Sequence, residues 1–266
     1  LFQAFMGTSS RKSENPGYWE TVNNYLKGVD PQELQDTLCR LVKGLIRSRA
    51  FEKARIRGRY YQVIVDGTQL YSSREEPDGK CLRRVRNRGT EREYTEYYYY
   101  VVEAKIMLHP KVYVSIMTEF AENQEESEKQ DCERKAFYRL IRRLREQFPM
   151  LPICVCGDSL YACGPFFAEC GARGCRYLLR FKEGSIPSIY GEYQKLRELE
   201  GNRQEETYRI PEKKPGKGNV KKGWKEKTVW HDYVTGIAYE GHAVNFIENG
   251  ESGEGKYPFY FLTDLP

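Results

Sequence analysis

Apolar residues recur along the chain at two kinds of spacing, which predict where helices and strands lie. A helix is predicted after Asp30, because an aspartate N-cap followed by Pro31 is a typical helix start. Five apolar residues then recur at helical spacing and are expected to face the core: Leu34, Leu38, Leu41, Val42 and Leu45. We therefore expect residues 1–55 to form an N-terminal helical segment.

From Arg59 onward the apolar residues occur in short runs, as expected for strands. Strands are predicted over residues 60–65, 97–108 and 112–120, and the short links favour an antiparallel meander. The segment 72–93 between the first two strands is expected to be a loop, because Pro77-Asp78-Gly79 is a strong turn signal.

A second amphipathic helix is predicted after an acidic linker. Its apolar face is expected to hold Cys132, Ala136, Phe137, Leu140, Ile141, Leu144 and Phe148. The other face carries basic residues, either solvated or contacting DNA: Arg134, Lys135, Arg139, Arg142, Arg143 and Arg145. A strand over 153–157, a short helix over 164–170 and a strand over 176–181 follow. The resulting order, β-β-β-α-β-α-β, predicts an α/β fold with a ribonuclease-H-like mixed sheet flanked by helices.

The composition changes after Gly184, where Gly, Lys and Glu become frequent, so we expect four regions. The helical segment 1–55 precedes the first part of the α/β core, residues 56–184. A β-rich insertion is expected over 185–256, where strands are predicted at 207–210, 228–233 and 243–247. One more apolar strand, within residues 257–266, is expected to return to the core.

Composition narrows the classes of function. The 266 residues carry a formal net charge of +5, and the sequence pI is about 8.6, which permits a DNA partner. No run approaches 18 apolar residues, so we expect no membrane span and a cytoplasmic protein. Eight cysteines form no CxxC pair. They are expected to be reduced and buried, with a metal or redox role as the less favoured alternative.

Two aspartates stand where chemistry is expected. Asp66 and Asp158 each follow a short apolar run, Val63-Ile-Val65 and Ile153-Cys-Val-Cys-Gly157. A carboxylate at the end of a buried strand is costly unless it is paired or binds a metal. Two such carboxylates can hold Mg²⁺ for phosphodiester chemistry. The alternative is that each aspartate is an ordinary turn or N-cap residue.

Basic and aromatic residues form two candidate DNA-binding groups. The first lies in the predicted loop and is expected to be close to Asp66: Arg83, Arg84, Arg86 and Arg88. The second lies in the insertion: Lys221, Lys222, Trp224 and Lys225, with further lysines and Trp230 nearby. Basic side chains neutralise phosphates and aromatic rings stack on unpaired bases. A solubilising surface with core tryptophans is the alternative.

Several of these elements together resemble bacterial insertion-sequence transposases of the DDE superfamily, in the branch with a β-rich insertion before the last acidic residue. The similar elements are Val65-Asp66-Gly67-Thr68, Thr118-Glu119-Phe120, Lys129-Gln130-Asp131-Cys132-Glu133, Gly157-Asp158-Ser159-Leu160-Tyr161-Ala162, Arg180-Phe181-Lys182-Glu183-Gly184 and Phe261-Leu262-Thr263-Asp264-Leu265. The resemblance runs from about Pro16 to Pro266. Its most specific elements are Gly-Asp-Ser-Leu-Tyr and Arg-Phe-Lys-Glu-Gly.

The resemblance implies a Mg²⁺-dependent enzyme, with Mn²⁺ as a substitute ion, that cuts and joins DNA. Asp66 and Asp158 correspond to the first two catalytic, metal-binding acids. The implied partners are double-stranded DNA, namely the terminal inverted repeats and the target, and a second copy in a synaptic homodimer.

The third acid of the family is a glutamate on a helix after the last strand. We expect it beyond Pro266, with Asp264 and Glu119 as less favoured substitutes. The 266 residues alone are therefore expected to be inactive or nearly so. Two alternatives stay open: a stand-alone nuclease, or a truncated or domesticated DNA-binding protein without catalysis.

Overall fold

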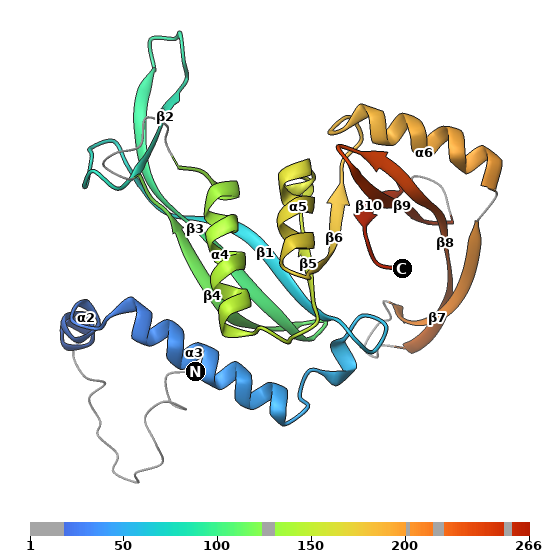
Figure 1. The fold of residues 1–266 in the computed structure, drawn as a ribbon, viewed down its shortest axis with the longest axis horizontal. Helices are drawn as coiled ribbons and strands as arrows, with labels where there is room; N and C mark the ends of the chain where they lie inside the picture. Colours follow the sequence, from blue (N-terminus) through green and yellow to red (C-terminus); the bar gives the residue numbers. More distant parts are fainter. Residues whose placement is uncertain (1–18, 124–130, 201–202, 215–220, 253–256) are drawn as a thin grey trace.

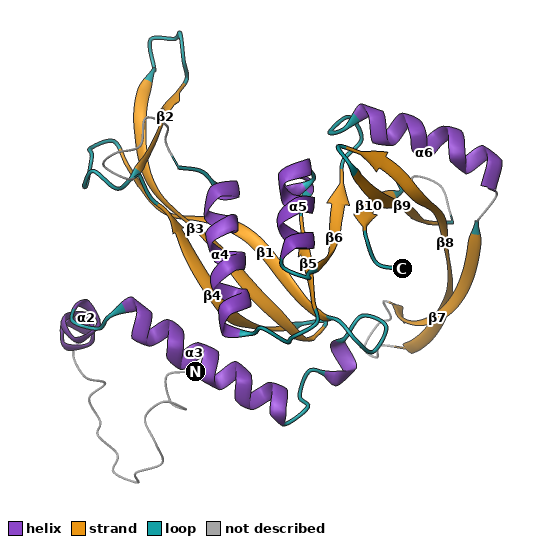
Figure 2. Ribbon diagram, in the orientation of Figure 1, coloured by secondary structure: helices purple, strands orange, loops and turns teal. Residues whose placement is uncertain are grey.

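The computed structural model describes residues 19–123, 131–200, 203–214, 221–252 and 257–266 (Figure 1). In these ranges the chain has a mixed α/β fold, with helices flanking one ten-stranded mixed sheet (Figure 2). Its strands are β1 (Tyr61–Ser73), β2 (Leu82–Arg86), β3 (Tyr94–His109), β4 (Val112–Ala121), β5 (Ile153–Gly157), β6 (Arg176–Phe181), β7 (Gln204–Lys214), β8 (Lys221–Tyr239), β9 (His242–Glu251) and β10 (Phe259–Thr263). Its helices are α2 (Trp19–Lys27), α3 (Pro31–Arg47), α4 (Glu133–Gln147), α5 (Gly164–Ala172) and α6 (Pro187–Glu200), with short 3-10 turns η1 (Glu52–Ala54) and η2 (Ser159–Tyr161).

The strand order is β2-β3-β1-β5-β6-β10-β9-β8-β7, with β4 paired to β3. The centre is parallel, because β5 pairs in parallel with both β1 and β6. Ile153, Cys154 and Val155 of β5 are fully buried, as a continuous apolar run in a central parallel strand requires. β1 pairs antiparallel with β3, and β3 with β4, so the predicted meander is confirmed.

The helix α4 packs on β3 and β4 through the apolar face that its sequence predicts. Every expected residue of that face is buried except Cys132, which is exposed as the N-cap, so its predicted burial is wrong. Phe137 of α4 stacks on Phe166 of α5 with ring centroids 5.0 Å apart. The two helices therefore lie side by side against the sheet (Figure 1).

The helix α3 begins as predicted, with the Asp30 side chain accepting a hydrogen bond from the backbone N–H of Gln32 (2.9 Å). Its buried face agrees with the prediction only in part: Val42 is buried as expected and Leu38 and Leu45 are half-buried, but Leu34 and Leu41 are more than half exposed. The polar residue Gln35 and Cys39 are buried as well. Gln35 donates to the carbonyl of Ile116 and accepts from the N–H of Thr118, on the edge strand β4.

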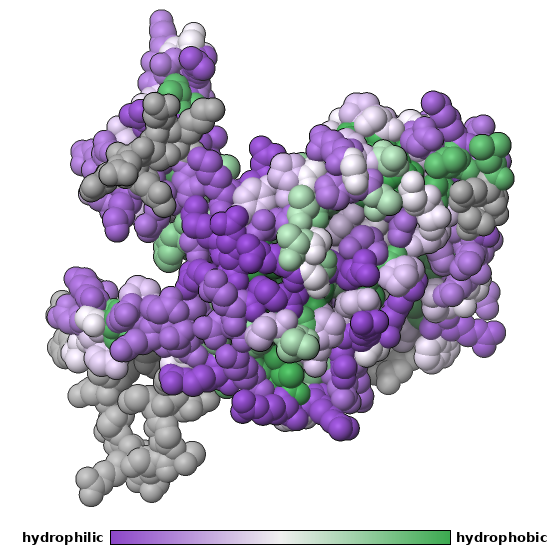
Figure 3. Space-filling view, in the orientation of Figure 1, coloured by the Kyte–Doolittle hydropathy of each residue, from purple (hydrophilic) through white to green (hydrophobic). Residues whose placement is uncertain are grey.

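The predicted loop 72–93 is wrong in part, because strands extend into it. β1 continues to Ser73 and β2 lies within the segment. Together with the first half of β3 they form an arm, residues 69–99, that projects from the body of the protein (Figure 1). Its surface is mostly hydrophilic in the view of Figure 3.

The insertion 185–256 contains the three predicted strands, which are longer than expected, and a helix that was not predicted, α6. Tyr193 of α6 stacks on Phe246 of β9, with ring centroids 4.1 Å apart. β8 and β9 pair with each other and, through β10, join the same sheet as the core. Across the described ranges, every helix is too short or too polar to span a bilayer.

Candidate active site and nucleic-acid interface

The sheet brings Asp66 and Asp158 to adjacent positions. β1 and β5 pair in parallel from Tyr61 with Ile153 to Ile64 with Cys156. Continuing this register by two residues places Asp66 beside Asp158, on strands about 4.8 Å apart. Laterally paired residues of parallel strands point to the same face. Both aspartates are exposed, and the continued register puts them on the same face of the sheet.

That face is the one opposite α4. A Cβ placed on Gly67 would point at the carboxylate of Glu133 in α4, so residue 67 faces this helix. Successive residues of a strand point to opposite faces, so Asp66 faces away from α4. The two aspartates thus lie on the face of the sheet opposite α4.

Each aspartate uses one carboxylate oxygen in a local bond. Asp66 Oδ1 accepts from the N–H of Gly67 (2.9 Å), and Asp158 Oδ1 accepts from the N–H of Leu160 (2.8 Å) as the N-cap of η2. Asp158 is therefore an N-cap residue, with one carboxylate oxygen used for this role. Within the described residues, neither aspartate side chain forms an ion pair or a second hydrogen bond, so one carboxylate oxygen of each stays available.

This donor set fits a magnesium ion in chemistry and in number. Mg²⁺ is bound in many phosphate-handling proteins by one or two carboxylates, with water and phosphate oxygens completing the octahedron. No three Asp, Glu, His or Cys side chains in the described ranges gather closely enough to hold a metal together. A bound ion would therefore rest on Asp66 and Asp158 alone among these residues.

Glu133, in the first turn of α4, lies on the α4 side of the sheet against the backbone of Gly67, a placement that the sequence pattern does not predict. Its Oε2 accepts from the hydroxyl of Tyr100 (2.5 Å) and its Oε1 from that of Tyr161 (2.8 Å). Burial raises the pKa of both phenols, and the Glu133 carboxylate raises them further. Both tyrosines therefore stay protonated donors at neutral pH.

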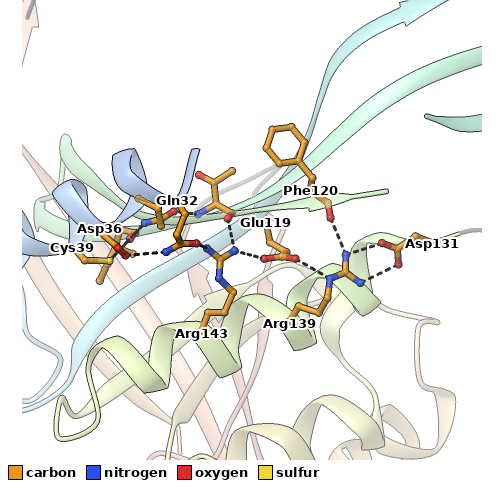
Figure 4. A network of polar contacts seen from close by, with 11 residues as sticks. Gln32, Asp36, Cys39, Glu119, Phe120, Asp131, Arg139 and Arg143 are labelled. Carbon is orange, nitrogen blue, oxygen red and sulfur yellow. Dashed lines mark hydrogen bonds and ion pairs between the residues drawn. The ribbon is translucent and has the colours of Figure 1, made fainter. Parts of the chain in front are cut away.

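Glu119 is not placed to bind a metal at this site. Figure 4 shows its carboxylate between two arginines of α4, with Arg139 Nε at 2.8 Å and Arg143 Nη1 at 2.6 Å. Arg139 also binds Asp131 (2.7 Å), which is buried. These arginines tie α4 to β4, so part of the basic face of α4 is paired with carboxylates.

Asp264 lies away from the aspartate pair. Its Oδ1 accepts from the N–H of Tyr177 (2.8 Å), and its Oδ2 contacts Arg176 (3.3 Å). Tyr177 pairs with Val155. Val155 comes three residues before Asp158, which is about 10 Å along the strand. β10 is also two strands away from β5. Burial raises the pKa of Asp264 despite the nearby arginine. Asp264, which follows β10, thus binds the first residues of β6 with its side chain.

The four predicted DNA-binding arginines lie along the arm, so the expectation that they lie close to Asp66 is wrong. Arg83 pairs with Tyr97, which is level with Ser73, seven residues beyond Asp66 on β1. At about 3.3 Å per residue this is roughly 23 Å along the strand. Arg84 comes nearest, because its Nη2 donates to Gln69 Oε1 (2.6 Å).

Charge along the arm is partly neutralised. Arg84 and Arg86 both bind Glu96, at 2.7 and 2.6 Å, and these bonds lower the pKa of Glu96 to about 2. The three residues together therefore carry one positive charge. Arg88, in the turn after β2, is exposed. The arm thus offers its clearest phosphate-binding charge near its tip.

The insertion presents a second exposed group. Trp224 is 70% exposed at the start of β8, beside Arg209 and Glu226, and Lys225 is exposed next to it. The side chains of Lys221 and Lys222 lie outside the described part of the structure. Trp230 differs from Trp224, because its ring packs against Gly250 and under the guanidinium of Arg203 (4.1 Å).

The cysteines do not form a metal site within the described residues. All eight are free thiols, and five are buried: Cys39, Cys81, Cys154, Cys170 and Cys175. Burial raises the pKa of Cys170 well above its ordinary value, which makes this thiol unreactive at neutral pH.

The sequence was compared with known proteins at two levels. No family model matches the chain. A search of curated proteins likewise finds no match. The functional conclusion therefore rests on the site's geometry and on the motifs themselves.

Proposed function

We propose that this chain is the DNA-processing core of a DDE-superfamily insertion-sequence transposase with a ribonuclease-H-like sheet. The observation that carries the proposal is the β1–β5 register, which aligns Asp66 with Asp158 on one accessible face. The motifs Gly157-Asp158-Ser159-Leu160-Tyr161 and Arg180-Phe-Lys-Glu-Gly184 point to the same family. The reaction proposed is hydrolysis of phosphodiester bonds at the element ends, followed by strand transfer into target DNA.

Different residues of the chain would have different roles in this reaction. Asp66 and Asp158 would hold Mg²⁺, or Mn²⁺ in its place, on the face of the sheet opposite α4. There the ion could bind a phosphate of the DNA. When bound, the ion supplies Lewis-acid stabilisation of the attacking and leaving oxygens. The short aspartate side chains keep the ion close to the rigid sheet. η2 fixes Asp158 through its N-cap bond, so this ligand is oriented before DNA arrives.

The basic groups support a DNA substrate that spans the sheet. β2 in the arm and β8 in the insertion are seven strand steps apart in the sheet order. At about 4.8 Å per step this is about 34 Å along the sheet. That length is close to one turn of B-DNA, about 34–36 Å. In the sheet order the strands that carry the aspartates, β1 and β5, lie between β2 and β8, so a duplex contacting both basic groups would cross these strands.

Metal binding tests the proposal directly. Mn²⁺ binding to the 266-residue chain is measured by electron paramagnetic resonance in the wild type and in Asp66→Asn and Asp158→Asn. We expect each substitution to weaken binding at least tenfold. Asp264→Asn is the matched control, because it removes an aspartate charge outside the site and is expected to leave Mn²⁺ affinity unchanged.

A wild-type chain that binds no Mn²⁺ at millimolar concentration would contradict the proposal. Retained binding of a 30-base-pair duplex in that case would favour the second candidate, a DNA-binding protein without catalysis. The lack of a third carboxylate beside the pair in the described residues is the observation that favours this candidate. Duplex binding is measured by fluorescence anisotropy across a salt series, because phosphate contacts make affinity salt-dependent.

A further inference from the structure

We propose that Glu133 is a positioning residue, whose carboxylate ties Tyr100 to Tyr161 and thereby fixes Asp158 relative to Asp66. The inference rests on the proposed function, since it assigns a purpose to a residue beside that site. Glu133 does not contact substrate in this proposal. It acts through the two tyrosines and the turns that they hold.

We call Glu133 and its hydrogen bonds to Tyr100 and Tyr161 the clamp. Its first half holds the turn that carries Asp158. Tyr161 ends η2, and its backbone N–H donates to the carbonyl of Asp158 (3.3 Å). Its ring is 1% exposed and packs against Phe137 and Phe166. Its hydroxyl reaches Glu133 Oε1 at 2.8 Å. A shift of η2 would therefore have to break a hydrogen bond to a charged acceptor as well as this aromatic packing.

The second half of the clamp lies against the backbone that carries Asp66. Tyr100 is level with Gln69 in the β1–β3 register, and its hydroxyl reaches Glu133 Oε2 at 2.5 Å. A Cβ added at Gly67 would come within 2.2 Å of the Tyr100 hydroxyl and 2.6 Å of Glu133 Oε2. The glutamate head group is thus seated on the strand directly beside Asp66, and glycine leaves the room for it.

The chemistry of the clamp indicates more than packing. In the described residues Glu133 has no lysine or arginine partner and is held by two neutral hydroxyls. Glu133 lies on the α4 side of the sheet, opposite the face that Asp66 occupies, and among the described residues it does not form a three-carboxylate group with Asp66 and Asp158. Neutral donors orient the glutamate without cancelling its charge.

Tyr161→Phe tests the clamp, because it keeps the ring in its packing and removes only the hydroxyl. Tyr193→Phe is a matched control: Tyr193 is fully buried, and its hydroxyl also donates to a carboxylate, that of Glu248. Hydrogen exchange at the amides of residues 158–162 and Mn²⁺ affinity are measured in the 266-residue chain for both variants. Neither quantity depends on catalytic turnover.

We expect Tyr161→Phe to speed exchange at residues 158–162 about tenfold, since it removes one hydrogen bond to a charged group. We also expect this substitution to weaken Mn²⁺ binding about tenfold, which is typical when a residue that orients a metal ligand is lost. Tyr193→Phe should leave both unchanged. Tyr100→Phe should weaken Mn²⁺ binding in the same direction as Tyr161→Phe.

Unchanged exchange at residues 158–162 in Tyr161→Phe would overturn the positioning role. The positioning role would also be overturned if both tyrosine variants bound Mn²⁺ as tightly as the wild type while Glu133→Gln lost Mn²⁺ binding. Glu133 would then be a direct ligand of the ion. Absent Mn²⁺ binding in the wild type contradicts the proposed function itself. In that case the exchange measurement alone still decides whether the clamp holds η2.

Discussion

Replacing Gly67 with alanine is expected to destabilise the protein, although the backbone at this position suits any residue. Gly67 is not among the glycines with positive φ, so an alanine would meet no backbone strain. Its methyl group would instead come within 2.2 Å of the Tyr100 hydroxyl and within 2.6 Å of two atoms of the Glu133 carboxylate. The hydroxyl must therefore withdraw by about 1 Å, the difference from an ordinary C···O contact of roughly 3.3 Å.

The expected cost follows from what this shift breaks. Losing the Tyr100–Glu133 hydrogen bond, which has a charged acceptor, costs about 1.5–3 kcal/mol. Restricting the unfolded chain by a Gly-to-Ala change returns about 0.4–1 kcal/mol. The net expectation is a loss of about 1–2 kcal/mol. For a chain of this size that corresponds to a fall in Tm of roughly 2–8 °C.

Urea unfolding followed by circular dichroism measures this loss. Gly191→Ala is the matched control, because Gly191 lies in the helix α6 and has nothing within 4 Å of the added Cβ. It is expected to stabilise the protein by about 0.5–1 kcal/mol. The double variant Gly67→Ala/Tyr100→Phe should recover part of the loss, because it removes the nearest clashing atom. A Gly67→Ala protein as stable as the wild type would refute this reasoning.

Three further outcomes are expected. Trp224→Ala should leave Tm unchanged but weaken duplex binding by about 1–3 kcal/mol in fluorescence anisotropy, whereas Trp230→Ala should lower Tm because its ring is packed. Glu119→Gln should cost about 2 kcal/mol in urea unfolding and leave Mn²⁺ affinity unchanged, since it unpairs two arginines far from any metal. In an alkaline titration at 295 nm, Tyr161 and Tyr193 should ionise only as the protein unfolds, because burial raises the pKa of both phenols. The stability that they contribute is therefore full below about pH 10 and falls as the pH rises beyond it.

The central elements were predictable from the sequence because each has a strong local pattern. The strands over 153–157 and 176–181 have the predicted bounds, and the apolar face of α4 is buried as expected. The parallel pairing of β1 with β5 follows from two short apolar runs that fill the centre of a sheet. The local pattern was also enough to single out Asp66 and Asp158.

The prediction for α3 was wrong for Leu34 and Leu41, although Val42 is buried as expected, because a polar contact outweighs apolar periodicity there. The edge strand β4 presents unpaired backbone groups, and the amide of Gln35 satisfies the carbonyl of Ile116 and the N–H of Thr118. Meeting these groups turns Leu34 and Leu41 toward the surface. No hydropathy pattern signals that a glutamine is needed at an edge.

The helix α6 was missed for a different reason. Ile189, Tyr193 and Leu196 have helical spacing, but Gly191 interrupts the pattern and the surrounding residues are rich in charge. Its burial depends on Phe246, more than fifty residues later, which supplies the surface that Tyr193 covers. Tertiary packing thus overrides a weak local preference.

The clamp beside the aspartates could not be predicted from any one segment, because its four parts lie on four elements. Gly67, Tyr100, Glu133 and Tyr161 each look ordinary in their own segment, as a turn glycine, a strand tyrosine, a first-turn glutamate and a buried aromatic. The structure makes them interdependent: the glutamate fits only where residue 67 has no side chain. We therefore expect related chains to change these positions together. A larger residue at position 67 should occur with loss of the tyrosine hydroxyl at 100 or of the glutamate at 133, and a comparison of related sequences in which position 67 varies independently of both would contradict the clamp.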